Sequence, residues 1–249
     1  MRYRYLVAGV MAFSLVAGCA KPEMQTKIEE SYPSGAKKKE ICYFAAGARP
    51  DIVKTTYYFE DGKKKSESNL KGDKRDGITT TWFVSGQKNT ETEYSAGIRN
   101  GKEQTWHESG QLKSFSAFVN DTPAGASVNY YEDGKRARQI NYVAGKAEGD
   151  DSCWFADGTV KSVVPYKAGQ RQGVEREWFA NGQLKLEHTL VNGGIEGLES
   201  TWYQNGKKEL ELNYKDGLVH GKKTKWDENG RKVADAIYEN GNLVEGQSY

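Results

Sequence analysis

The stretch WFANGQLKLEHTL, residues 178–190, is followed 24 residues later by a near-copy, WYQNGKKELELNY, residues 202–214. All six tryptophans lie four residues before a glycine of this repeat, and Tyr58 and Tyr130 occupy the two remaining places. The glycines themselves follow one another at intervals of 24: Gly62, Gly86, Gly110, Gly134, Gly158, Gly182, Gly206 and Gly230. A fixed period of this length indicates a repeat architecture, so the period decides the fold.

Each repeat predicts one β-hairpin. After each glycine, apolar and polar residues alternate, as in residues 208–214, where Leu210, Leu212 and Tyr214 share one face of a strand. The segment before each glycine is rich in Thr, Trp, Tyr and Phe, which favour strands. The Ser-Gly, Asp-Gly and Asn-Gly pairs in between predict a hairpin turn. We therefore expect an all-β protein, an elongated antiparallel β-meander or solenoid of about eight tandem 24-residue hairpins over residues 55–249.

Successive hairpins are expected to pair edge to edge, because a lone hairpin is marginal in water. At about 4.8 Å per strand, eight repeats give an object roughly 80 Å long. The Trp and Tyr columns are expected to form ladders on one face of this sheet. Asp121, in place of a return-turn glycine, and Pro165, within a strand, predict interruptions of the sheet.

The N-terminal end carries features of export. Arg2 and Arg4 precede an apolar stretch over residues 6–17, which is too short to span a bilayer. It ends in LVAGC, which resembles the lipobox of bacterial lipoproteins. The resemblance implies that residues 1–18 are a cleaved signal peptide and that Cys19 is lipidated, whereas an ordinary signal peptide with an incidental cysteine is the alternative. Ala20 after Cys19 implies sorting to the periplasmic side of the outer membrane. Residues 19–31 are expected to be a lipidated, polar tether, and residues 32–54 a degenerate first hairpin.

Charge and cysteine content limit the function. Without residues 1–18 the basic residues fall from 36 by two to 34, equal to the 34 acidic residues. Such a balance gives no electrostatic support for nucleic-acid binding. Cys42 and Cys153 lie four to five repeats apart, roughly 40 Å in a straight stack, so we expect no disulfide between them.

No catalytic or metal-binding constellation is present in the sequence. His107, His188 and His220 fall at three different positions of the repeat, and no nucleophile or zinc-protease motif occurs. The aspartates before the turn glycines are explained by turn chemistry. We expect a non-enzymatic protein without catalytic residues, metal or cofactor.

One column of side chains is explained by neither the turns nor the core. The residue after the tryptophan position forms an aromatic stripe in seven of the eight repeats, Asp227 being the exception: Phe59, Phe83, His107, Tyr131, Phe155, Phe179 and Tyr203. By alternation it points away from the tryptophans. It is either a second structural ladder or a row of rigid anchors for a protein partner. On the second interpretation the candidate partner-binding residues are Phe83, Tyr131, Phe155, Phe179 and Tyr203.

The repeat resembles the MORN-repeat variant family. The matching features are the W-[FY]-x-x-G-[QK] segment, the Tyr eight positions after its glycine, and the G-x-x-x-G return, over residues 57–246. Proteins of this family are often labelled YwqK-type antitoxins. The resemblance implies a membrane-anchored lipoprotein that binds a protein partner, such as a toxin, as an immunity or antitoxin factor. The alternative is an envelope structural protein with lipid contact, as the older name of the repeat suggests.

Overall fold

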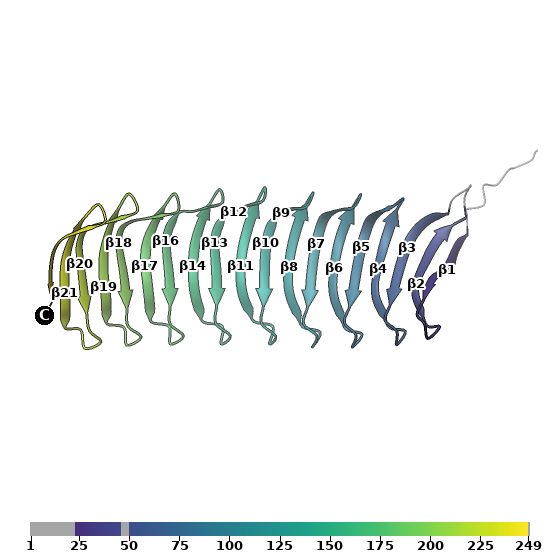
Figure 1. Cartoon of the computed structure of the whole chain (residues 1–249), viewed down its shortest axis with the longest axis horizontal. Coiled ribbons are helices and arrows are strands. Elements are labelled where there is room, and N and C mark those ends of the chain that lie inside the picture. The colour runs from purple at the N-terminus through teal and green to yellow at the C-terminus, as the bar shows by residue number, and fades with distance from the viewer. Residues whose placement is uncertain (1–22, 46–49, 249) are drawn as a thin grey trace, which may run out of the picture.

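The computed structural model describes residues 23–45 and 50–248, which form a single open antiparallel sheet of 22 strands (Figure 1). Cys19 and the proposed signal peptide lie outside the described residues. Within the described ranges no helix is long and apolar enough to cross a membrane. Successive strands of the chain pair side by side, and three of them are interrupted, so that in each case two short segments pair in line with the strand before them. The predicted all-β meander of tandem hairpins is therefore confirmed.

The strands are β1 (Met24–Ser31), β2 (Lys37–Phe44), β3 (Asp51–Tyr58), β4 (Lys64–Lys71), β5 (Lys74–Trp82), β6 (Lys88–Ser95), β7 (Ile98–Trp106), β8 (Leu112–Val119), β9 (Thr122–Pro123), β10 (Gly125–Tyr130), β11 (Arg136–Val143), β12 (Lys146–Ala147), β13 (Gly149–Trp154), β14 (Val160–Lys167), β15 (Gln170–Arg171), β16 (Gly173–Trp178), β17 (Leu184–Val191), β18 (Gly194–Trp202), β19 (Lys208–Lys215), β20 (Leu218–Trp226), β21 (Lys232–Glu239) and β22 (Asn242–Ser248).

Two kinds of turn alternate along the sheet. In the first, the Phe83 amide donates to the Gln87 carbonyl and the Gly86 amide donates to the Phe83 carbonyl, with Gly86 at φ 96°. In the second, Ala96 and Gly97 both have positive φ, 51° and 93°, which is the backbone of a two-residue type I′ turn. The tight hairpin turn is therefore the return turn. The Ser-Gly, Asp-Gly and Asn-Gly pairs instead lie in a wider turn, in which only the glycine is left-handed.

The sheet stays continuous at the two predicted interruptions. Asp121 takes the left-handed conformation with φ 61°, and its carboxylate accepts the backbone amide and the Nε of Arg99. Pro165 pairs with Asp150 on one side, and on the other side its carbonyl accepts the Gln172 amide in the gap between β15 and β16. Neither residue breaks the meander, because each falls where the repeat already departs from regular pairing.

The predicted tether over residues 19–31 is wrong for its second half, because Met24–Ser31 form strand β1. β1 pairs with β2, so the first hairpin spans residues 24–44 rather than 32–54. The strand is exposed along its whole length and buries no apolar face that would mark it in the sequence. Backbone pairing holds it, together with the ion pairs Lys39–Glu29 at 2.7 Å and Lys38–Glu30 at 2.9 Å.

The Trp and Tyr columns lie on opposite faces, which corrects the expected single face. In β5 Thr79 and Trp82 point to opposite sides, since successive side chains alternate. Thr79 pairs with Thr92, and Tyr94 lies two residues further on the same face as Thr92. The parity changes because Trp82 pairs with Lys88 while Thr81 pairs with Thr90, which leaves one extra residue in the second strand.

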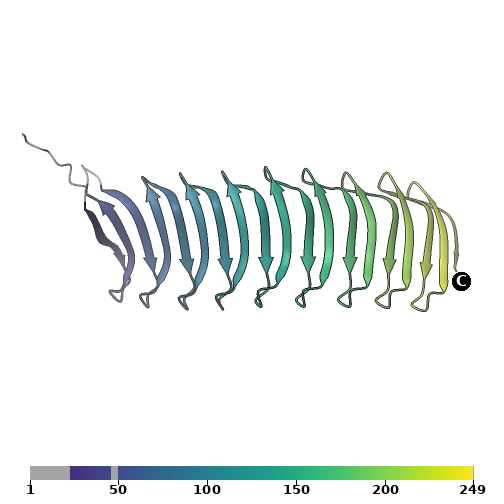
Figure 2. The same ribbon diagram turned by 180° about the vertical axis from the view of Figure 1, so that it is seen from behind.

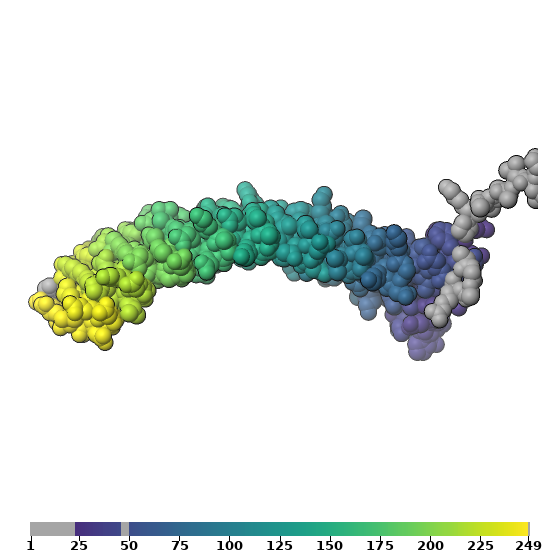
Figure 3. Space-filling view, turned by 90° about the horizontal axis from the view of Figure 1, so that it is seen from above, coloured from purple at the N-terminus to yellow at the C-terminus, as the bar shows by residue number. Residues whose placement is uncertain are grey.

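The sheet is a single layer without a conventional core. Among the described residues no large side chain is more than 98 % buried, and only six apolar residues count as buried. Packing therefore runs along the sheet, from each hairpin to the next, as in other repeat proteins. The body is elongated and bowed, with the N-terminal and C-terminal strands at opposite ends and both broad faces open (Figures 2 and 3).

Candidate functional site

The two faces of the sheet differ in what covers them. We call the side that bears the six tryptophans the tryptophan face. The tyrosine face is the opposite side, which bears Leu70, Tyr94, Phe118, Tyr142, Tyr166, Leu190, Tyr214 and Tyr238. A partner protein could contact either face, and the two faces differ in their aromatic rows and in the contacts of their charged side chains.

The tryptophan face is covered by the chain's own cations. Lys88 Nζ lies 4.8 Å from the ring centre of Trp106, and the Arg136 guanidinium lies 5.1 Å from that of Trp154. Lys88 also pairs with Glu91 at 2.7 Å. Lys64–Trp82 and Lys208–Trp202 repeat the arrangement. Cations placed over indole rings satisfy both groups, so this face has structural contacts across most repeats. The tyrosine face has such contacts as well, with the Arg75 guanidinium 5.2 Å from the ring centre of Tyr94 and that of Arg99 3.9 Å from the ring centre of Phe118.

The aromatic stripe lies on the tyrosine face. Phe59 follows the tryptophan position directly, and it is approached by Lys65 at 5.8 Å, whereas the preceding Lys64 approaches Trp82 on the other side. The stripe therefore borders one edge of the tyrosine face, at the wider turns. The Tyr and Phe column borders the other edge, at the return turns, so the sheet brings two aromatic rows onto one face.

The stripe has structural contacts of its own. Tyr131 donates its hydroxyl to the Trp154 carbonyl at 2.6 Å, and Tyr203 does the same to Trp226 at 2.8 Å. Each bond joins one hairpin to the next. Phe83, Phe155 and Phe179 lie in equivalent places and, like the tyrosines, are half-buried. The ladder interpretation thus explains the two hydroxyls, and partner binding by the five stripe residues stays a prediction.

Carboxylates line the middle of the tyrosine face between the two aromatic rows. Thr92 Oγ1 donates to Glu103 at 3.2 Å. Arg138 donates to both oxygens of Asp151, at 2.8 and 2.7 Å, and this pairing raises the pKa of the arginine. Asp151 is 8 % exposed, and partial burial strengthens such charge-assisted bonds.

His188 lies between two of these carboxylates. Its Nδ1 is 3.1 Å from Glu199 and its Nε2 is 3.5 Å from Glu175. The histidine is buried, and its acidic neighbours were not predicted from the sequence. Glu175 lies 13 residues before His188 and Glu199 lies 11 residues after it, so both occupy the same position of the 24-residue repeat. Because that position pairs with the position of His188 in the neighbouring strand, its spacing could have predicted both contacts.

The other histidines are distant from this group. His107 Nε2 lies 3.2 Å from the Tyr130 carbonyl in the stripe, and His220 lies near the Asn240 amide at the return turns. Among residues 23–45 and 50–248 no three His, Cys, Asp or Glu side chains come together as metal ligands. Cys42 and Cys153 are free thiols in β2 and β13.

Comparison with known families gives one match. The model of the MORN repeat variant matches residues 99–114, 125–144, 171–192 and 195–216. No curated protein matches the chain. The matched segments span hairpins between β7 and β19, and each contains one glycine of a wide turn and one glycine within a strand, all with positive φ.

Proposed function

Because the chain is built from MORN repeat variants, we propose that it is a non-enzymatic binding scaffold that holds a partner protein along the tyrosine face. The observation that carries this proposal is the asymmetry of the two faces. Cations lie over aromatic rings on both faces, but the tryptophan face carries one aromatic row, whereas the tyrosine face presents two half-buried aromatic rows with carboxylates between them. Aromatic side chains with little rotamer freedom are the residues that dominate protein interfaces.

An elongated repeat surface suits recognition better than catalysis. Most hairpins contribute one aromatic residue to each row, with Leu70, Leu190 and Asp227 as the exceptions. A partner can therefore contact several repeats at once, and its affinity can grow with the number of repeats covered. A standard interface buries about 800 Å² on each partner. A few adjacent hairpins offer that area without any change in the fold.

The location that we propose is the bacterial cell envelope, on the periplasmic side of the outer membrane, through a lipid on Cys19. The support is the VAGC sequence that ends at Cys19. A lipid anchor at the N-terminal end would leave the repeat sheet free to meet a protein that enters the envelope. A toxin neutralised by an immunity factor is the partner class that fits this arrangement.

Affinity capture from detergent-solubilised envelopes tests the function. The full chain should capture the same partner repeatedly, and serine substitutions at Phe83, Phe155 and Phe179 should abolish capture. Replacement of Lys88 and Glu91 on the tryptophan face provides the matched control and should leave capture intact. If both sets of variants capture equally well, the tyrosine face is not the binding face. If the chain instead sediments with protein-free vesicles of envelope lipids, the lipid-contact alternative is favoured.

A further inference from the structure

Strand β22 lies at the C-terminal edge of the described sheet. Every first strand of a hairpin from β3 to β20 pairs with a strand on each side, whereas within the described chain β22 pairs only with β21. All seven of its residues are exposed. Its outer edge therefore presents a row of unpaired amides and carbonyls, which is a template for another strand.

Two rows of small residues lead from this open edge into the tyrosine face. Lys223 pairs with Ala236, which pairs with Gly246. In the parallel row Lys225 pairs with Ala234, and Ala234 pairs with Ser248. Each row therefore has a lysine at its inner end and only small side chains between that lysine and the edge.

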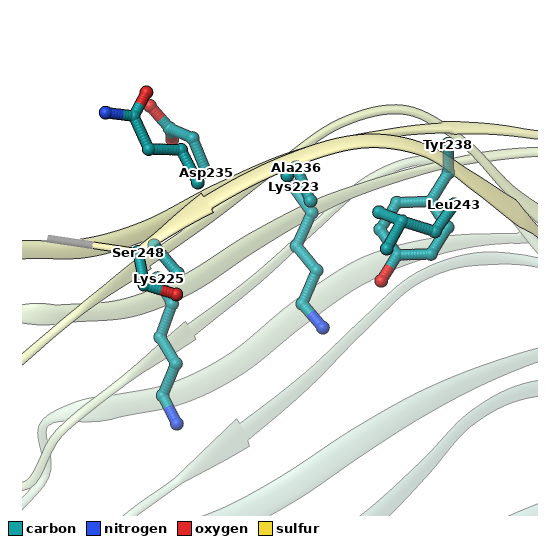
Figure 4. Close-up of a pocket in the computed structure, with 10 residues that line it drawn as sticks. Lys223, Lys225, Asp235, Ala236, Tyr238, Leu243 and Ser248 are labelled. Atoms are coloured by element: carbon teal, nitrogen blue, oxygen red, sulfur yellow. The ribbon is translucent and has the colours of Figure 1, made fainter.

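The small residues open a hollow of about 350 Å³ at this end of the sheet. One hairpin earlier the corresponding places hold Leu210 and Leu212 instead of alanine. Tyr238 and Leu243 line the same hollow and give it an apolar wall (Figure 4).

The two lysines lack acidic partners. Lys223 Nζ lies 5.8 Å from the ring centre of Tyr238, and among the described residues neither Lys223 nor Lys225 takes part in an ion pair. The neighbouring Asp235 points to the other side of the sheet (Figure 4), where it pairs with Lys222 and Lys232. The hollow therefore holds two positive charges that nothing in the described chain balances.

We propose that the open edge of β22 and this hollow bind an extended acidic segment of the partner protein, with glutamates two residues apart. A strand added to β22 would present every second side chain on the tyrosine face. That spacing matches the one between Lys223 and Lys225. The added strand would lie three strand spacings, roughly 14 Å, from the lysine backbone, so glutamate has the reach that aspartate lacks.

Antiparallel pairing adds one further recognised side chain to the motif. An antiparallel strand would place its first glutamate in the row of Ser248 and its second in the row of Gly246. The next side chain on the same face would then lie against Leu243 and Tyr238, where an apolar residue fits. The sequence class recognised is therefore Glu-x-Glu-x-Leu, held by main-chain pairing and selected by charge.

This inference deepens the proposed function, since it names one site and the chemistry of the segment bound there. The test uses the full chain in detergent and a fluorescent peptide, TETETLT, with TQTQTLT as its uncharged counterpart. We expect TETETLT to bind in a salt-sensitive manner. Its affinity should fall at least about tenfold when Lys223 and Lys225 are both replaced by Gln, since truncating one side of a charge pair removes the attraction.

Two further variants separate the site from general electrostatics and from unfolding. Ala236→Leu fills the hollow with the side chain found at Leu212, so the fold should persist while peptide affinity falls. Lys222→Gln removes one charge from the opposite face of the same strand and should leave binding unchanged.

Equal binding of both peptides, no binding of TETETLT at millimolar concentration, or a loss in Lys222→Gln as large as in the Lys223 and Lys225 variant would overturn the proposal. So would a dimer, detected by light scattering, that excess TETETLT does not dissociate. Partner capture that persists in the Lys223 and Lys225 variant while peptide binding fails would refute this site alone. Loss of capture only in the Phe83, Phe155 and Phe179 variants would leave the proposed function standing.

Discussion

The hydroxyl of Tyr131 donates to the carbonyl oxygen of Trp154, 2.6 Å away and 23 residues later in the chain. This bond joins the start of one wide turn to the end of the first strand of the next hairpin. Tyr32 makes the same bond to Tyr58 at 2.8 Å. A hairpin repeat without a core depends on such contacts, because each hairpin is stable only through its neighbours.

Removal of that hydroxyl should weaken the junction without opening a cavity. Tyr131→Phe should lower the free energy of unfolding by about 1 kcal/mol, the usual net contribution of one hydrogen bond. Urea denaturation followed by tryptophan fluorescence measures it. Tyr57→Phe is the control, because Tyr57 is 38 % exposed and its hydroxyl has no hydrogen bond within the described chain. Equal effects in the two variants would show that the Tyr131 bond contributes nothing specific.

The group Glu175–His188–Glu199 gives a second stability test. His188→Leu places in β17 the residue that β19 carries at Leu212, so its shape is tolerated by the repeat. It also leaves two carboxylates, 10 % and 14 % exposed, without their shared partner. We expect a loss of about 1–3 kcal/mol in the free energy of unfolding. Ile140→Leu, at the same repeat position, should cost less than about 1.5 kcal/mol. A His188→Leu protein as stable as wild type would show that the carboxylates need no partner.

The repeat period predicted the fold, but not the side of the sheet on which each column lies. Trp82 and Tyr94 are separated by an even number of residues, which placed them on one face by simple alternation. The extra residue between Lys88 and Thr90 reverses that parity, and nothing in the alternation of polar and apolar residues marks it. β1 was missed for a related reason, since a strand exposed on both sides carries no buried pattern.

The candidate site was predictable only in part. The aromatic stripe follows from the period alone, because it recurs beside every tryptophan position except that of Trp226, which Asp227 follows. Its bonds to the next hairpin depend on three-dimensional stacking, and so does the neighbourhood of His188. The hollow beside Lys223 depends on where the sheet ends, which only the pairing of β22 reveals.

Acid should destabilise the sheet through its wide turns. The carboxylate of Asp61 accepts the Lys63 amide and that of Asp133 accepts the Lys135 amide, bonds that lower the pKa of each aspartate from the usual 3.8. Since the folded-state pKa lies below the unfolded one, the contribution is complete above about pH 4 and is lost as pH falls through the folded-state value. We therefore expect the melting temperature to fall below about pH 4.

The chain supplies the control for that acid transition. Asn205 occupies the equivalent turn position, and its Oδ1 accepts the Lys207 amide at 3.0 Å without titrating. Asp61→Asn and Asp133→Asn together should keep the turn bonds and flatten the fall in melting temperature between pH 4 and the folded-state pKa. An acid profile identical to that of wild type would mean that other carboxylates account for the loss.

Lipidation has a direct test. Cys19→Ser removes the thiol that the VAGC sequence designates for acylation, so a clickable fatty acid should label the wild-type protein and not the variant. Cys42→Ser, in strand β2, is the matched control and should label as strongly as wild type. Equal labelling of the Cys19→Ser variant would remove the lipoprotein assignment and leave an ordinary signal peptide.

The double role of the stripe permits a final test of the binding face. Tyr131 and Tyr203 hold successive hairpins together, whereas Phe83, Phe155 and Phe179 have no polar atom for that purpose. Serine at the three phenylalanines should abolish partner capture. Because each ring is only half-buried, the melting temperature should fall only by a few degrees for each kcal/mol of unfolding free energy that the variant loses. Phenylalanine at Tyr131 and Tyr203 should lower the melting temperature and leave partner capture intact, since it keeps the rings and removes only the junction bonds.

Affinity and melting temperature are to be measured on the same proteins. Loss of capture with the fold intact in the first variant supports a binding face. Capture that follows melting temperature in both variants would make the stripe a structural ladder and exclude it as the contact surface.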